Sequence, residues 1–135
     1  VHEMKGEILL RSNRPKEAVA PFRKAIALDR TKAGFIQIEL GHALLEAGGK
    51  ANAAEAAKVL SLGVQKDPTA LSGFSYLARA RAMSGDEAGA LLASAELAFR
   101  TGNKPAAKNY AKRAQQSFKR GSPRWLRAQD IIELK

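Results

Sequence analysis

Histidine and cysteine are the residues that most often carry catalysis or bind metals, and both are scarce in this 135-residue chain. There are two histidines, His2 and His42, and no cysteine. A zinc-peptidase helix needs two histidines one helical turn apart with a glutamate as general base, but no second histidine follows His2 and Glu3 at that spacing. The sequence also lacks a nucleophile elbow and a phosphate-binding loop. We therefore expect no enzymatic activity, cofactor or metal within this segment.

Positive charge is the second chemical feature of the sequence. The formal net charge is +10, and no acidic residue lies between Glu96 and Asp130. Basic residues in that window recur along one predicted helix, and we call four of them the basic face: Lys104, Lys108, Lys112 and Arg113. Such a face could meet an acidic partner, an anionic membrane surface or nucleic acid. We favour a solubilising surface and expect no specific nucleic-acid binding, because aromatic residues do not interleave with the lysines as base stacking requires.

Helices must position these side chains, because apolar residues recur at helical spacing along almost the whole chain. Hydrophobic residues make up 45% of the sequence, and many of the eleven glycines and five prolines separate the periodic segments. No apolar run approaches the roughly 18 residues that span a bilayer, so we expect no transmembrane segment. The helical pattern is already under way at Val1, which predicts a domain excised from a longer protein.

Two stretches repeat the same order of small and large residues. Small residues stand where two helices must approach closely, and a large residue fills the gap between them. The first set is Gly6, Ala18, Phe22 and Ala25, and the second set is Gly41, Ala56, Leu60 and Gly63. This pattern resembles the tetratricopeptide (TPR) repeat, a helix–turn–helix unit of about 34 residues. The resemblance implies an all-α, TPR-like superhelix of stacked antiparallel helix pairs.

The repeats divide a single domain, residues 1–135, into overlapping units and a cap. We place the units at about 1–30, 31–67, 68–101 and 86–121, with a C-terminal capping helix over 122–135, which makes about eight helices. The helix from Asp86 to Thr101 is expected to serve twice, completing the third unit and beginning the fourth. The last helix, which contains Trp125, is expected to cover Tyr110 and Phe118 at the open end of the stack.

Three local features depart from the regular pattern. Pro21 stands inside the second helix and predicts a kink or a late helix start, because proline removes a backbone donor. The longer spacing from Gly41 to Ala56 predicts a longer turn around Lys50–Ala53. Thr69 is expected to cap the helix that follows it.

The TPR resemblance also implies where a partner would bind, because the first helices of such units line the concave side of the stack. Helical spacing puts six residues on that side: Glu7, Ile38, His42, Leu45, Arg79 and Met83. They would form a peptide groove of mixed polarity, and the alternative is a solvated face with a few ordinary apolar residues. Carboxylate-clamp chaperone adaptors place basic and amide residues there, whereas this chain has Glu3 and Glu7, which disfavours that ligand.

Three short segments resemble a more particular family. They are His2–Gly6, Leu91–Glu96 and Gly121–Asp130, and together they resemble the C-terminal tail of bacterial zinc-dependent peptidases with appended TPRs. Those proteins carry a His-Glu-x-x-His domain upstream, are typically exported to the periplasm, and are associated with quality control of envelope proteins.

The resemblance to that tail implies a non-catalytic interaction module in the periplasm or cell envelope. Such a module would position substrates or dock the enzyme to an envelope complex. Its partners would be a protein or peptide on the concave surface and its own upstream catalytic domain, where zinc is expected.

Two alternatives stay open at this point. The chain could be a free-standing TPR scaffold or adaptor, or a basic nucleic-acid-binding helical repeat, a reading that rests on charge alone. The residues upstream of Val1 would separate the peptidase tail from the adaptor.

Overall fold

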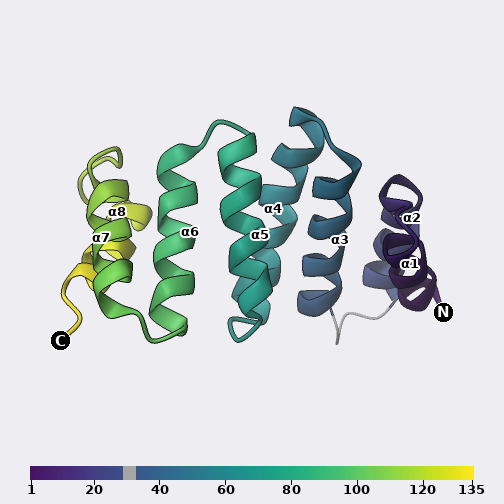
Figure 1. The fold of residues 1–135 in the computed structure, drawn as a ribbon, viewed down its shortest axis with the longest axis horizontal. Helices are drawn as coiled ribbons and strands as arrows, with labels where there is room; N and C mark the ends of the chain where they lie inside the picture. The colour runs from purple at the N-terminus through teal and green to yellow at the C-terminus, as the bar shows by residue number, and fades with distance from the viewer. Residues whose placement is uncertain (29–32) are drawn as a thin grey trace.

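The computed structural model describes residues 1–28 and 33–135, and these ranges contain eight α-helices and no β-strand. The helices are α1 (His2–Arg11), α2 (Pro15–Leu28), α3 (Ala33–Ala47), α4 (Lys50–Lys66), α5 (Leu71–Met83), α6 (Glu87–Arg100), α7 (Lys104–Gln115) and α8 (Pro123–Ile132). They form an elongated array with the two termini at opposite ends (Figure 1). The all-helical class is confirmed, whereas the boundary expected between units 1–30 and 31–67 lies outside the described residues.

The packing of the helices is repeat-like. Each helix packs against the next one in the chain, and further contacts join α1 to α3, α3 to α5 and α6 to α8. Long-range side-chain contacts recur at nearly constant spacing: Arg23 reaches Glu55 across 32 positions, and Arg79 reaches Glu46 across 33. Stacked helix pairs of about 34 residues produce contacts at this spacing, because equivalent positions of neighbouring pairs lie side by side.

The core of the first half of the array, in α1–α5, fits large side chains against glycines. Phe22 of α2 and Leu60 of α4 are fully buried. A Cβ atom on Gly6 of α1 would lie 2.7 Å from Cε1 of Phe22, and one on Gly41 of α3 would lie 2.3 Å from Cγ of Leu60. Both glycines therefore occupy the same place in their helix pairs, as the sequence predicts.

The core of the second half, between α6, α7 and α8, consists mainly of alanine. Its buried residues are Leu92, Ala95, Ala98, Ala107, Ala111, Ala114, Ala128 and Ile131. Ile131 of α8 is its largest fully buried side chain, at 1% exposure. Alanines let helices approach closely, but each one buries little apolar area.

Helix α6 belongs to both cores. Its Ala93 and Leu97 pack with the first core, whereas Leu92, Ala95 and Ala98 belong to the second. The helix packs against α5 on one side and against α7 on the other (Figure 1). Helix α6 therefore links the two cores, and its membership of two repeat units stays a prediction.

The turn between α3 and α4 is shorter than predicted. Gly48 and Gly49 form it with φ angles of 85° and 93°, a left-handed backbone that suits glycine. Helix α4 then begins at Lys50, so the longer turn expected around Lys50–Ala53 is wrong. The extra residues lengthen the helix instead, because α4 has 17 residues where α2 has 14.

Two other local predictions also need correction. Helix α2 runs from Pro15 to Leu28, so the late start at Pro21 is wrong, whereas the kink stays a prediction; Pro21 is buried. That burial offsets the backbone hydrogen bond that proline cannot donate. Thr69 does not cap α5: the N-cap position is Ala70, and the Thr69 hydroxyl donates to Asp67 Oδ1 at 2.8 Å.

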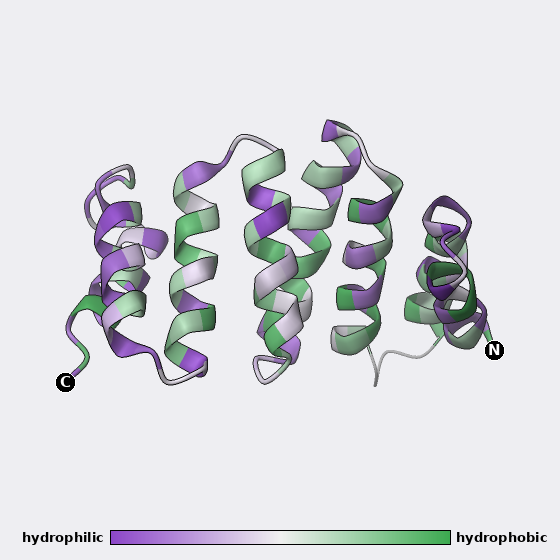
Figure 2. Ribbon diagram, viewed as in Figure 1, coloured by the Kyte–Doolittle hydropathy of each residue, from purple (hydrophilic) through white to green (hydrophobic). Residues whose placement is uncertain are grey.

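Helix α8 covers the C-terminal end of the array. The hydroxyl of its N-cap Ser122 accepts a hydrogen bond from the Trp125 amide at 3.3 Å. Tyr110 and Phe118 pack, partly buried, against the second core. The helix ends at Ile132, inside the range expected for the cap. Hydrophilic residues cover much of the neighbouring α7 (Figure 2).

Candidate functional site

A polar cluster joins α3 to α5 on the surface of the first half. The rings of His42 and Tyr76 stack with their centroids 4.3 Å apart and their planes 11° from parallel. One turn further along each helix, Arg79 Nη1 donates to Glu46 Oε1 at 2.9 Å. The same carboxylate oxygen lies 3.6 Å from His42 Nε2. We call these four residues the α3–α5 cluster.

Burial sets the protonation of the stacked pair. It lowers the pKa of His42 below 6.5; Glu46 opposes this effect, and Arg79 adds to it. Burial also raises the pKa of Tyr76 above 10, and the nearby Glu39 and Glu46 carboxylates add to the rise. At neutral pH the pair is therefore an uncharged imidazole stacked on a protonated phenol. Each ring then has a hydrogen-bonding edge and an apolar face, which suits it to contacts with a polypeptide.

Carboxylates extend this surface toward α1. Burial raises the pKa of Glu39 above 4.5, with Glu7 of α1 the next largest cause. Glu7 is half-buried, and because α1 contacts α3, its carboxylate acts on Glu39 across that contact. We use the term α1–α3–α5 face for the α3–α5 cluster together with Glu7 and Glu39. The face carries three carboxylates against one guanidinium, and Arg11 and Glu3 of α1 act on Glu39 in opposite directions. The excess of negative charge favours positively charged ligands.

The structure divides the residues predicted for the groove into two groups. Glu7, His42 and Arg79 lie on the α1–α3–α5 face, and Met83 at the end of α5 is 42% exposed. Ile38 and Leu45, by contrast, are 1% and 2% exposed, so their assignment to the groove is corrected. Both belong to the first core, where they cannot contact a partner directly.

The burial of Ile38 follows from two glycines on neighbouring helices. A Cβ atom on Gly63 of α4 would lie 2.9 Å from Ile38 Cγ1, and one on Gly73 of α5 would lie 3.0 Å from Ile38 Cδ1. The isoleucine thus fills a gap that these glycines leave open. Leu45 lies two helical turns further along α3, on the same side, and is buried as well.

Sequence analysis missed three members of the face: Glu39, Glu46 and Tyr76. A signal for them exists, because Glu39, His42 and Glu46 are spaced i, i+3 and i+7, the spacing of one helical stripe. Tyr76, Arg79 and Met83 follow the same spacing on α5.

The basic face has a different character. Lys104 Nζ donates to the backbone carbonyl of Lys135 at 2.8 Å. Lys108, Lys112 and Arg113 make no ion pair within residues 1–28 and 33–135. These side chains thus lie on the surface of α7 without carboxylate neighbours to hold them in place.

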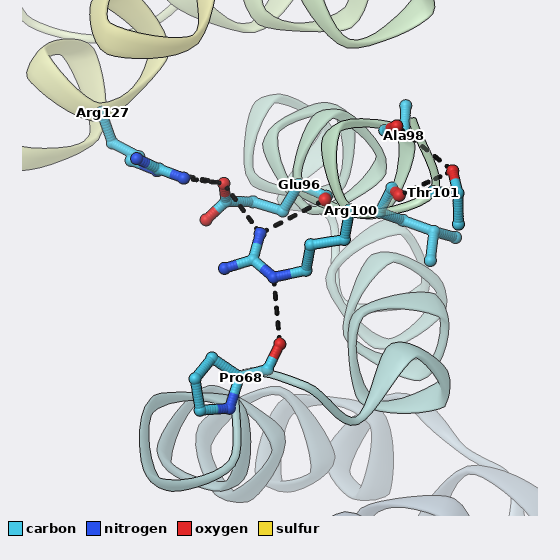
Figure 3. A network of polar contacts seen from close by, with 7 residues as sticks. Pro68, Glu96, Ala98, Arg100, Thr101 and Arg127 are labelled. Carbon is cyan, nitrogen blue, oxygen red and sulfur yellow. Dashed lines mark hydrogen bonds and ion pairs between the residues drawn. The ribbon is translucent and has the colours of Figure 1, made fainter. Parts of the chain in front are cut away.

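Other basic residues near α7 are tied into the fold. Arg127 of α8 donates to Glu96 Oε1 of α6 from Nη2 at 2.6 Å and from Nε at 3.0 Å (Figure 3). Arg100 lies 3.4 Å from the same carboxylate oxygen and donates through Nε to the carbonyl of Pro68 at 3.0 Å. It also lies 4.1 Å above the ring of Phe74. This network joins α8, α6 and the segment before α5, and its role is structural.

Metal and membrane sites can be examined over the same residues. No three His, Asp or Glu side chains converge as a metal site would require in the part of the chain that the structure describes. Among the helices α1 to α8, none combines the length and the apolar character needed to cross a bilayer. Zinc in an upstream segment stays a prediction.

Comparison with known proteins gives no family to which the chain can be assigned. No protein-family model matches the sequence, and no curated protein matches it significantly.

Proposed function

We propose that this chain is a non-catalytic protein-interaction module that binds an extended polypeptide segment on its α1–α3–α5 face. The observation that carries this proposal is the α3–α5 cluster. Two helices hold an aromatic pair and an ion pair in adjacent turns, with the rings stacked at 4.3 Å. A surface whose side chains are already ordered loses less conformational entropy when it binds.

The chemistry of the face indicates the kind of segment that fits. Tyr76 and His42 offer hydrogen-bonding edges, and Arg79 keeps donors beyond the one directed at Glu46. The carboxylates Glu7, Glu39 and Glu46 outnumber the single guanidinium, so a segment that contains Lys or Arg is favoured. Met83, at 42% exposure, adds an adaptable apolar contact at one end.

The parent protein proposed here is a secreted zinc-dependent metallopeptidase with this chain as its C-terminal TPR domain. The support is the repeat pattern of the sequence, together with the segments His2–Gly6, Leu91–Glu96 and Gly121–Asp130. In such a protein, in the periplasm or cell envelope, the module would position substrates for the upstream domain or dock it to a complex. A free-standing adaptor would use the same face without a protease.

A peptide-display selection against the whole chain tests the binding proposal. We expect the selected peptides to be basic. Tyr76→Ala should lower the affinity for them about tenfold or more, as loss of a central aromatic contact does. Arg79→Glu should change which peptides are selected. Arg113→Glu is the matched control, because it reverses an arginine on the basic face. Equal affinities for the wild type, Tyr76→Ala and Arg79→Glu would contradict the proposal.

A second experiment separates the peptidase tail from the adaptor. The natural upstream segment should be expressed with and without residues 1–135, and turnover of a folded protein compared with that of a short peptide. The module should change the first more than the second, because its surface contacts stretches remote from the scissile bond. An upstream segment without a His-Glu-x-x-His helix would refute the peptidase parent but leave the binding proposal standing.

A further inference from the structure

A pocket of about 430 Å³ lies away from the α1–α3–α5 face and shares no residue with it. Its walls come from α4, the end of α5, the N-cap of α6 and the start of α8. The lining residues are Ala57, Lys58, Ser61, Leu62, Arg81, Asp86 and Arg124. Helices α4 and α8 do not pack against each other in the described ranges, and the pocket occupies the space between them.

The charges in this pocket do not balance. It contains three basic side chains, Lys58, Arg81 and Arg124, and one carboxylate, Asp86, so its formal net charge is +2. Asp86 already accepts two contacts from Arg124 Nη1, at 2.9 and 3.1 Å, and one from the Gly89 amide at 3.0 Å. Little of its acceptor capacity is left for the other two cations.

Arg81 is partly buried, whereas Lys58 is exposed to water. Arg81 Nη1 donates to the backbone carbonyl of Gly89 at 3.1 Å, and no ion pair joins Arg81 to a carboxylate within residues 1–28 and 33–135. Burial lowers the pKa of its guanidinium and the neighbouring Arg124 lowers it further, whereas Asp86 and Glu96 act against this effect. Arg81 and Arg124 thus repel each other beside Asp86, which accepts its hydrogen bonds from Arg124. A bound anion would relieve this repulsion and accept the free N–H donors.

We propose that this pocket binds the carboxylate of an acidic residue that stands beside an apolar residue in a partner polypeptide. The guanidinium of Arg81 and the ammonium of Lys58 would bind the carboxylate. Ala57 and Leu62, the latter 47% exposed, would contact the apolar neighbour. Asp86 disfavours a dianionic phosphate more strongly than a single carboxylate, since like charges repel at this range. The site selects the opposite charge from the α1–α3–α5 face and does not depend on the function proposed for it.

The test is an NMR titration of the isotope-labelled chain with three probes. They are acetyl-glutamyl-leucine amide, its neutral glutaminyl counterpart, and inorganic phosphate. The glutamyl peptide should shift the Arg81 side-chain signal and the Leu62 and Gly89 amides in a saturable way. The neutral peptide should bind about tenfold more weakly, because a charge-assisted hydrogen bond is lost.

Variants identify the pocket as the site of binding. Arg81→Gln should lower the affinity for the glutamyl peptide about tenfold. Lys58→Gln should lower this affinity less, and it should not affect folding because Lys58 is exposed. Arg113→Gln removes the same charge from the basic face and should leave the affinity unchanged. The proposal is overturned if the Arg81, Leu62 and Gly89 signals report tighter binding of phosphate than of the glutamyl peptide. Equal weakening by Arg81→Gln and Arg113→Gln, or shifts centred on α7, would overturn it as well.

Discussion

The two halves of the array bury their helices by different means. In the first half a large side chain enters a space left by a glycine, as Phe22 does at Gly6 and Leu60 at Gly41. In the second half alanines such as Ala107 meet other small residues, and few large side chains are buried. Ion pairs join helices in both halves, and in the second half Arg127 with Glu96 links α8 to α6 at the edge of the alanine core.

The surfaces of the two halves also differ, in how firmly their side chains are held in place. The first half presents stacked and paired side chains from α3 and α5, with His42 on Tyr76 as the centre. The second half presents lysines on α7, such as Lys108 and Lys112, without carboxylate neighbours in the described residues. A recognition surface needs side chains held in place, whereas a solubilising surface does not. The comparison therefore supports the proposal that the first half carries the surface for an extended polypeptide.

The largest effect should come from the same substitution made in both cores. Leu60→Ala should lower the free energy of unfolding by an amount in the upper part of about 2–5 kcal/mol, because the Gly41 backbone cannot move in to fill the cavity. Leu92→Ala should fall in the lower part of that range, since Leu92 is less completely buried. Urea denaturation gives both values. Equal losses would show that the two cores do not differ in packing.

Gly41→Ala should lower the free energy of unfolding by less, but it tests the contact between Gly41 and Leu60 directly. Its Cβ would lie within 2.9 Å of three Leu60 carbons, so overpacking of about 1–3 kcal/mol outweighs the helix propensity that alanine gains. In a Leu60→Ala background the same substitution should become stabilising, because the clashing side chain is gone. Thermal melting of the four proteins in this cycle measures the coupling. A cost that is the same in both backgrounds would refute the close contact.

Breaking the pair between α6 and α8 should have a smaller effect. Glu96→Gln should destabilise the chain by about 1 kcal/mol, since the contact is only partly shielded from water. Arg127→Gln in the same background should add little, because its carboxylate partner is already neutral. A double-mutant cycle at low and high salt measures the interaction. Additive effects with no salt dependence would show that the pair does not contribute to the second core.

The smallest effects concern pH. Since burial lowers the pKa of His42 below 6.5, the unfolded chain binds the proton more readily, and stability is lost as the pH falls below about 6.5. Since burial and Glu7 raise the pKa of Glu39, the folded chain keeps that proton longer, and stability is lost as the pH rises above about 4.5.

The two contributions can be separated by substitution. His42→Gln should reduce the loss of stability on the acid side, and Glu39→Gln should reduce the loss above about pH 4.5. Melting temperatures measured between about pH 4 and pH 8 give the profiles. Profiles that match the wild type in both variants would show that neither group titrates differently in the folded chain.

Much of this fold could be predicted because the helix ends depend on local chemistry. Gly85 and Gly102, which have positive φ, follow the ends of α5 and α6, where the chain needs a left-handed residue. Helix α7 ends at Gln115, before the glycine at 121 that the sequence offers as a stop. The sequence also predicts that Gly6 and Gly41 occupy equivalent places, because each stands at a similar distance before a large residue, Phe22 or Leu60. The contact of α6 with both cores followed from its having two apolar faces.

The candidate site was harder to predict, because it depends on which neighbour covers each face. Periodicity puts Ile38 and His42 on similar sides of α3, but glycines on α4 and α5 allow Ile38 to be buried. The stacking of His42 on Tyr76 depends on how far one helix pair is shifted along the next. That shift is set by tertiary packing, which periodicity alone does not give.

The most direct test of the account is to map where a selected peptide binds on the isotope-labelled chain. We predict that the NMR signals of His42, Tyr76 and Arg79 shift on binding, and that in Tyr76→Ala the His42 and Arg79 shifts require about tenfold more peptide. Signals of α7, from Lys104 to Gln115, should stay in place. Shifts concentrated on α7, with the α3–α5 cluster unaffected, would contradict the claim that the first half of the array is the binding surface.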